Sequence, residues 1–344
     1  MAVNINHYTD NIVSSGSTVV VNNLLITSVG SGVTVGSAGI TTYYGDGSNL
    51  TGISGGSGVF DADNTTNLYS CTITSLPSRT TGDSNFFVGT GAGKGLTSGK
   101  NNIGIGTSAG ASLTVGCHNN FLGACAGCSN TTGTDNNFFG FKAGLCNTTG
   151  GCNNFFGRYA GRCNITGSRN NFFGFRAGFN NTTGFSNNFI GQYTGHQNTT
   201  GQYNNFFGNK AGYCNTTGSC NNFFGHCTGW YHSTGVNNTF IGSCAGCGRS
   251  GFNVTGDSNF FAGVGAGYSA TTARQNVAIG HSTLHRNETG IHNVAIGSSA
   301  GFSNLSGGFN NFLGHCAGYC NTTGSDNNFF GCCAGFRNTT ASNN

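Results

Sequence analysis

Residues 136–152 read NNFFGFKAGLCNTTGGC, and the chain carries fifteen copies of this 17-residue pattern, the first of which begins at Asn85. One four-residue insertion, between the copies that start at Asn238 and Asn259, interrupts an otherwise constant period. Such a period is typical of a stack of similar units, each of which contacts mainly its neighbours. We therefore expect a solenoid, and we number the repeat positions from 1, the first Asn, to 17.

The composition indicates a packed fibrous chain and argues against several classes of protein. The 344 residues include 62 Gly and 29 Phe but a single Pro, and only 6% are charged, against roughly 25% in an average soluble domain. Disordered chains lack aromatic residues, whereas these Phe residues recur at fixed repeat positions. The net charge of +4 is spread thinly, without the basic stripe that a nucleic-acid partner needs. The sequence has no apolar run of about 18 residues, so we expect no membrane insertion.

Glycine at fixed positions predicts short strands joined by tight turns. Position 5 is Gly in all fifteen copies, and position 9 is Gly in all except the copy that has Leu284. Gly is the residue for positive φ or close backbone approach, so Gly140, Gly157 and Gly174 are expected at corners. So many Gly and Asn residues would weaken a helix. The predicted fold is all-β, a parallel β-solenoid or β-roll of 17-residue coils about 4.8 Å apart, with a length of roughly 70 Å.

The Asn at position 1 predicts a ladder of side chains along the solenoid. It is present in every copy, as at Asn136, Asn153 and Asn170. Stacked Asn side chains in cross-β structures bond from one strand to the next. We expect the same of these amides between neighbouring coils.

Adjacent apolar residues at positions 3 and 4 predict self-association. Consecutive side chains of a strand point to opposite faces, so one Phe of a pair can fill the coil interior while the other forms a surface ladder. Burial of a Phe side chain contributes roughly 1.5–3 kcal/mol, and over many coils this predicts a stable assembly. A homotrimer, intertwined or side by side, is the simplest arrangement, and a dimer or packing against another protein is the alternative. The pairs expected in core and trimer packing are Phe138 with Phe139, Phe155 with Phe156, Phe172 with Phe173, Phe206 with Phe207, Phe223 with Phe224, and Phe329 with Phe330.

Residues 1–84 lack the repeat and form a separate predicted region. Short β-rich runs at 17–21, 24–29, 33–35 and 40–44 are broken by Gly and Ser, and residues 52–58 are typical of a flexible hinge. We interpret 1–84 as an attachment or assembly region and 85–344 as the shaft. Because Asn344 stands where a sixteenth copy would begin, the shaft is expected to continue beyond the chain end.

Two sets of motifs resemble known repeat families. The sequence NVAIG at 276–280 and 293–297 resembles the repeat in the head of trimeric autotransporter adhesins, which implies a trimeric left-handed parallel β-roll. The fuller NNFFGxxAGxxNTTG form, and the segment at 39–53, resemble repeat arrays of bacteriophage tail fibres and other phage structural proteins, particularly of phages that infect cyanobacteria. The resemblance covers residues 36–344. The chain departs from adhesin heads by having Phe in place of Ala or Val and by its longer period, which leaves handedness and register open.

The resemblance implies a structural role. An autotransporter would need a signal peptide and a membrane anchor, and neither pattern occurs in this sequence. We therefore expect a structural fibre protein of a phage virion, a tail fibre or similar appendage that mediates host attachment as shaft or adhesin. Its partners would be itself, other virion proteins through residues 1–84, and host surface glycans. A self-assembling extracellular filament or adhesin is the alternative, and an ice-binding solenoid is a third.

Candidate chemistry in the repeat is sparse. No two carboxylates are placed for paired acid–base work, so we expect no enzyme and no cofactor. The 16 Cys are interpreted as thiols, with stacked disulfides or metal binding as alternatives. The Asn-x-Thr triplets are interpreted as turns, and their glycosylation is open. The weak metal candidates are Cys125, Cys128, Cys244, Cys247, Cys316 and Cys320. The candidate glycan contacts are Tyr193, Tyr213, Trp230, Tyr231 and Tyr319.

Overall fold

The computed structural model describes residues 4–6, 11–13, 61–62, 68–70, 81–251 and 254–344. The chain divides into two compact units, Met1–Ser54 and Gly55–Asn344. In the first unit, β1 (Asn4–Asn6) pairs antiparallel with β2 (Asn11–Val13). The runs predicted as strands at 17–21, 24–29, 33–35 and 40–44, and the hinge at 52–58, lie outside the described residues.

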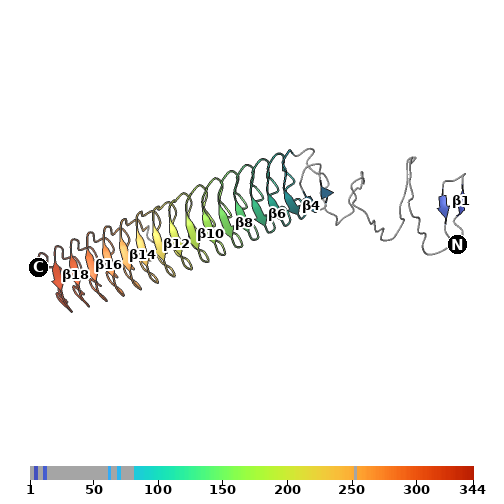
Figure 1. Ribbon diagram of the computed structural model, residues 1–344. Coiled ribbons are helices and arrows are strands. Elements are labelled where there is room, and N and C mark those ends of the chain that lie inside the picture. The colour runs from blue at the N-terminus through green and yellow to red at the C-terminus, as the bar shows by residue number, and fades with distance from the viewer. Residues whose placement is uncertain (1–3, 7–10, 14–60, 63–67, 71–80, 252–253) are drawn as a thin grey trace. The chain divides into compact units, whose positions relative to one another are not determined.

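The second unit is a β-solenoid, which confirms the predicted fold class (Figure 1). Each repeat contributes one three-residue strand, and successive strands pair parallel and in register, so that Phe138 lies beside Phe155 and Phe155 beside Phe172. The strands are β5 (Phe86–Val88), β6 (Ile103–Ile105), β7 (Asn120–Leu122), β8 (Asn137–Phe139), β9 (Asn154–Phe156), β10 (Asn171–Phe173), β11 (Asn188–Ile190), β12 (Asn205–Phe207), β13 (Asn222–Phe224), β14 (Thr239–Ile241), β15 (Phe260–Ala262), β16 (Val277–Ile279), β17 (Val294–Ile296), β18 (Asn311–Leu313) and β19 (Asn328–Phe330).

Strand pairing begins before the predicted start of the shaft and passes through the insertion. β3 (Asp61–Ala62) pairs antiparallel with β4 (Leu68–Ser70), and β4 pairs parallel with β5. At the insertion, β14 still pairs in register with β15, Thr239 beside Phe260. The four extra residues are therefore accommodated in the connection between these strands.

One column of Phe side chains fills the interior of twelve coils, and the position 3 residue is Gly104, Ala278 or Ala295 in coils 2, 12 and 13. The position 3 residue of each strand points inward, and Phe138, Phe155 and Phe172 are completely buried. Their rings stack in parallel, with centroids 4.8 Å apart for each neighbouring pair. Position 9 must be Gly beside such a ring, because a Cβ on Gly144 would lie 2.4 Å from Cε2 of Phe138. The interior therefore has room for one aromatic ring per coil.

Coil 12 reaches the same filling by a different pair of residues. Its position 3 residue is Ala278, and its position 9 residue is Leu284, which is fully buried with a φ of 48°. Leu284 Cδ2 lies near Gly301 of coil 13, where position 3 is Ala295, so the two short side chains Ala278 and Ala295 leave room for the Leu side chain. This substitution of two positions together explains the one exception to Gly at position 9.

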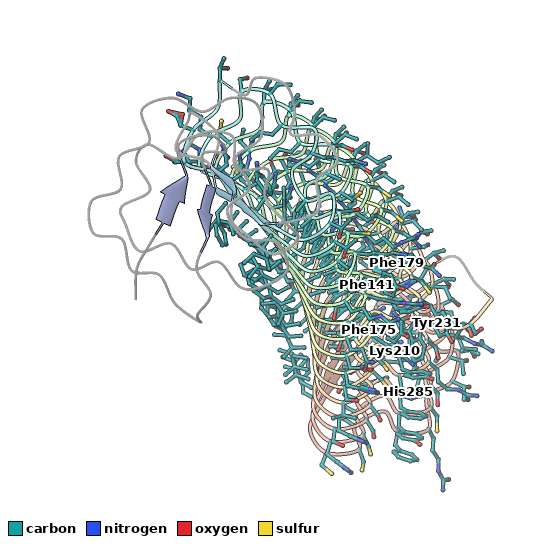
Figure 2. All side chains as sticks on the ribbon, turned by 90° about the vertical axis from the view of Figure 1, so that its right-hand side faces the viewer. Phe141, Phe175, Phe179, Lys210, Tyr231 and His285 are labelled. Carbon is teal, nitrogen blue, oxygen red and sulfur yellow. The ribbon has the colours of Figure 1, made fainter. Side chains whose placement is uncertain are left out.

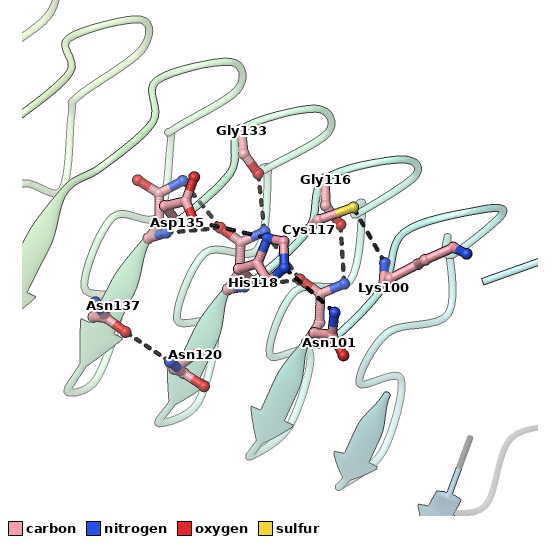
Figure 3. A network of polar contacts seen from close by, with 12 residues as sticks. Lys100, Asn101, Gly116, Cys117, His118, Asn120, Gly133, Asp135 and Asn137 are labelled. Carbon is pink, nitrogen blue, oxygen red and sulfur yellow. Dashed lines mark hydrogen bonds and ion pairs between the residues drawn. The ribbon is translucent and has the colours of Figure 1, made fainter. Parts of the chain in front are cut away.

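Three ladders of Asn side chains run along the solenoid. At position 1, the amide of Asn153 donates to Oδ1 of Asn136 over 3.1 Å and to the carbonyl of Gly167 over 2.8 Å. A second buried ladder lies at position 12, where Asn147 Nδ2 donates to Asn130 Oδ1 over 2.7 Å. The third lies at position 2 on the outer side of the strands, as between Asn120 and Asn137 (Figure 3). The ladders at positions 1 and 12 satisfy amides that would be costly to bury unpaired.

Tight turns with left-handed backbone close each coil. Position 5 is always Gly, with φ of 138° at Gly157 and 143° at Gly174. Positions 7 and 17 adopt left-handed φ whatever the residue, for example 57° at Lys142 and 58° at Arg169. A non-Gly residue there costs roughly 1–2 kcal/mol, so the interactions between coils must offset a repeated local strain.

Candidate interaction surfaces

The position 4 side chains form a continuous apolar ladder on the outer face of the strands. All fifteen are apolar, and their exposed fractions reach 43% at Ile241 within the stack and 63% at Phe330 in the last coil. Neighbouring rings stack, with centroids 4.6 Å apart for Phe139 and Phe156. We call this surface the apolar ladder; it comprises Val88, Ile105, Leu122, Phe139, Phe156, Phe173, Ile190, Phe207, Phe224, Ile241, Ala262, Ile279, Ile296, Leu313 and Phe330.

Beside the apolar ladder the same strands present a face with no charge. The position 2 amides of Asn137 and Asn154 bond to each other over 2.8 Å along the axis. No strand of β5–β19 contains a charged residue. Position 2 is Asn in nine coils and apolar in five, including Phe260, so the uncharged apolar face is wider there. An uncharged apolar stripe of this length is typical of a surface covered by another protein surface.

Each predicted Phe pair is divided between the interior and the surface. The first member, such as Phe206, is buried in the core, and the second, such as Phe207, lies in the apolar ladder. The last pair, Phe329 and Phe330, has exposed fractions of 9% and 63% because no further strand covers β19 among the described residues. Sequence alternation placed the two rings on opposite faces but did not tell which one is inside.

The five aromatic residues considered for glycan contact are half-buried and packed on other rings. Tyr213 stacks on His196 with centroids 5.0 Å apart, and Trp230 stacks on Tyr231 at 5.5 Å. Tyr319 lies between Phe302 and Phe336, at 5.0 and 5.1 Å. Tyr193 lies edge-on to Phe175 at 5.3 Å. Their ring faces are therefore largely taken by neighbours, and their edges and polar atoms are what a ligand would meet.

Threonine at position 14 forms one exposed column along the solenoid, with one residue from each of coils 3 to 9, such as Thr132 and Thr149. The hydroxyl at position 13 is used inside the stack, as where Thr131 Oγ1 donates to the carbonyl of Thr148 over 3.1 Å. A single column of Thr is narrower than the flat double row that we associate with an ice-binding face.

The fifteen cysteines among the described residues are free. Burial raises the pKa of Cys247 to about 12 and also raises that of Cys128, which disfavours the thiolate that zinc binds. Among the described residues, one group of three ligating atoms lies within 4.8 Å, from His315, Cys332 and Cys333. All three are exposed, and the sulfurs of Cys332 and Cys333 are 3.5 Å apart. None of the six cysteines considered from sequence belongs to this group.

His232 is a buried histidine in the position 12 column, where most coils have Asn. Its Nε2 accepts from Nδ2 of Asn238 over 2.8 Å, while its Nδ1 has no partner in the described structure. The ring lies between Phe223 and Phe240, and burial lowers its pKa to about 4. Oδ1 of Asn215, which would accept from an Asn in this place, is buried without a partner.

His232 should make the largest contribution to the pH dependence of stability, beside smaller ones from His196 and His285, whose pKa values burial also lowers. The folded pKa of His232, about 4, lies below the unfolded value of 6.5, so between these values the unfolded chain binds the extra proton. Stability is therefore full above pH 6.5 and falls as pH drops toward 4, by roughly 3 kcal/mol at most. His232→Asn should flatten this loss and raise stability at neutral pH, because Asn can donate to Asn215 Oδ1. Thermal unfolding between pH 4 and 7.5, with exposed His226→Asn as control, measures it; an unchanged acid loss in His232→Asn would refute the assignment.

Comparisons with known protein families, with curated proteins and with solved structures find no match. The described residues contain no helix able to span a membrane.

Proposed function

We propose that this protein is a structural fibre protein, a homotrimer whose solenoid is the shaft of a phage tail fibre or similar virion appendage. The observation that carries the proposal is the apolar ladder, because a regular rod with one apolar stripe along its whole length has a surface suited to copies of itself. Residues 1–84 would attach the shaft to other virion proteins, and host glycans would be the ligand of the particle.

The energy available at the apolar ladder supports assembly. Covering the exposed part of an outward Phe or Ile side chain, which is 43% or less in every coil before the last, contributes roughly 1 kcal/mol. Over fifteen coils this sum exceeds about 10 kcal/mol per chain, comparable with the 4–15 kcal/mol that association costs. Side chains spaced by one coil in every copy also match in register, so parallel chains can pack over their full length.

A closed cyclic arrangement suits this geometry. Three chains related by a threefold axis along the rod can place their apolar ladders together at that axis, which covers all three and leaves no unpaired copy of the surface. The resemblance to trimeric β-rolls and to phage fibre repeats supports the same arrangement and the virion location. The alternative of a free extracellular filament shares the shaft and differs in where the fibre is attached.

The first test is the mass of the full chain in solution. Light scattering should give three times the 35.2 kDa of one chain, and a stable monomer would contradict the proposal. Immunogold labelling then separates a virion appendage from free filaments in the medium, and label confined to free filaments would overturn the virion location.

A matched pair of variants tests whether the apolar ladder holds the trimer. Asn is tolerated in a stacked outward column, as position 2 shows, so replacing position 4 with Asn should keep the coil. Loss of five apolar side chains per chain should dissociate the trimer to monomers with unchanged circular dichroism. The variant is Phe139→Asn, Phe156→Asn, Phe173→Asn, Ile190→Asn and Phe207→Asn. The control, in the same coils on another face, is Thr149→Asn, Thr166→Asn, Thr183→Asn, Thr200→Asn and Thr217→Asn. Dissociation of the control alone would place the interface elsewhere.

A further inference from the structure

Cations that are scattered in the sequence come together on one face of coils 4 to 8. Lys142, Arg158, Arg162, Arg176 and Lys210 occupy positions 6, 7 and 10, which follow the corner glycine and so lie apart from the apolar ladder. We call these five cations and the rings that they contact the basic aromatic face; the rings are those of Phe141, Tyr159, Phe175, Phe179, Tyr193 and Trp230. Figure 2 shows Phe141, Phe175, Phe179 and Lys210 projecting from one side of the stacked coils. The sequence alone suggested no basic stripe.

Aromatic rings hold these cations in place. The guanidinium carbon of Arg176 lies 5.3 to 5.8 Å from the centroids of Phe179, Phe175, Tyr159 and Tyr193. That of Arg158 lies 5.0 Å from the Tyr159 ring, and Nζ of Lys210 lies 4.6 Å from the Trp230 ring. Cations fixed over ring faces lose less freedom when they bind a ligand. Nε of Arg176 is buried without a hydrogen-bond partner in the described structure, so Arg176 would bind through its terminal N–H groups.

In the part of the chain that the structure describes, no carboxylate forms an ion pair with a cation of the basic aromatic face. The sequence has no Asp or Glu between Asp135 and Asp257. The ion pairs among the described residues lie outside it, between Lys100 and Asp83, His118 and Asp135, and Arg249 and Glu288. A hydrogen bond from Arg158, together with nearby cationic charges, lowers the pKa of Tyr159, as a positive surface would.

Like charge excludes a second copy of this chain as the partner of this face. In a parallel trimer the same coils stand at the same height along the axis. If the basic aromatic faces pointed toward the threefold axis, the cations of the three chains would lie against one another. In the proposed trimer this face therefore points away from the axis. Lys142, Arg158 and Arg176 follow one another in successive coils and Lys210 lies two coils further, so the charges extend roughly 20 Å along the axis.

Neutral hydrogen-bonding groups fill the gap between the cations. Coil 7 carries Gln192, Tyr193 and Gln197 between Arg176 and Lys210, and Asn209 Nδ2 donates to Gln192 Oε1 over 3.1 Å. Spaced cations with amides and phenols between them suit a polymer that has many hydroxyls and spaced acidic groups. Single-stranded nucleic acid fits less well, because it needs free ring faces for its bases, and these rings already face cations or one another.

We propose that the basic aromatic face binds an anionic polysaccharide, one with carboxylate or sulfate groups, which lies along the shaft across coils 4 to 8. The Arg and Lys side chains bind the acidic groups, and the amides and tyrosine hydroxyls bind the sugar hydroxyls. This proposal rests on the proposed fibre function, and it specifies the class of glycan that the shaft would bind.

The test uses the full chain with alginate and dextran sulfate as probes, neutral dextran as their uncharged counterpart, and a single-stranded oligothymidylate. We expect both acidic polymers to bind with a salt-dependent affinity, and dextran not to bind. Arg158→Gln/Arg176→Gln/Lys210→Gln should weaken binding about 100-fold. The control variant Lys100→Gln/Arg169→Gln/Arg274→Gln removes the same number of charges from exposed sites at positions 16 and 17. It should change the affinity for the acidic polymers less than about threefold.

Other binding results would contradict either the site or the class of ligand. Equal losses in the two triple variants would show attraction by net charge alone and overturn the site, and tighter binding of oligothymidylate would replace the polysaccharide by nucleic acid. Light scattering on the same samples separates this proposal from the fibre. A trimer that binds neither acidic polymer would support the fibre proposal and contradict the polysaccharide proposal. A monomer whose binding depends on the three cations would support the polysaccharide proposal and contradict the fibre proposal. Circular dichroism of each variant confirms that a loss of binding is not a loss of fold.

Discussion

Gly157→Ala should destabilise the middle of the solenoid by roughly 3–5 kcal/mol, the largest effect we expect from adding one methyl group. Gly157 has a φ of 138°, which L side chains rarely adopt, and an added Cβ would lie 2.4 Å from the carbonyl oxygen of Gly174 in the next coil. That atom belongs to the backbone and cannot rotate away. Since coils contact mainly their neighbours, the damage should centre on the junction of β9 and β10.

Hydrogen exchange and denaturant unfolding measure the effect of Gly157→Ala. Amides of β9 and β10 should exchange faster, while those of β17 and β18 keep their protection. Gly151→Ser is the matched control, because position 16 is Ser in other coils, as at Ser168, and a Cβ on Gly151 is 3.1 Å from its nearest atom. Equal exchange in Gly157→Ala and the control would mean that position 5 does not require Gly.

The second large effect is expected in coil 12, where two substitutions should each destabilise and together recover. Ala278→Phe should introduce a ring into the space of Leu284, and Leu284→Gly should leave a cavity, with losses of roughly 2–5 kcal/mol each. The double variant Ala278→Phe/Leu284→Gly recreates the Phe and Gly pair of the other coils, as in Phe138 with Gly144. Its stability should be close to that of the wild-type chain.

A double-mutant cycle over these four proteins gives the coupling energy. We expect a coupling of at least about 3 kcal/mol, larger than is usual for side chains in contact, because both single variants fail in one shared space. Additive losses would show that the position 9 exception is unrelated to position 3. Ala295→Phe in the neighbouring coil, where position 9 is already Gly301, is an informative comparison because the side chain of Leu284 also lies near Gly301.

Stability and proposed function use different faces of the same coil. The interior Phe column and the buried Asn ladders hold each rod together, so changes there should unfold it. The apolar ladder and the basic aromatic face point outward, so the substitutions proposed there should alter assembly or binding with the coil intact. This separation makes the proposals testable one at a time.

The solenoid, its period and the division of each Phe pair between two faces were predictable from the amino-acid pattern. These properties follow from local rules, since strand side chains alternate and a repeated corner glycine bends every coil alike. The Asn at position 1 was likewise recognisable as a ladder, because it recurs without exception. The outward ladder at position 2 and the buried one at position 12 were not distinguished, because both columns admit other residues in several coils.

Three features became visible only in the folded coil: which ring of each pair is inside, how Leu284 replaces a ring, and where the cations gather. Residues 17 apart become neighbours only after the coil has closed, and the bends between strands set the direction in which each position points. Arg158 and Arg176 stand at different repeat positions, so the periodic pattern gives no sign that they share Tyr159. The physical reason is that a period fixes which residues stack along the axis, whereas contacts around the coil depend on its cross-section.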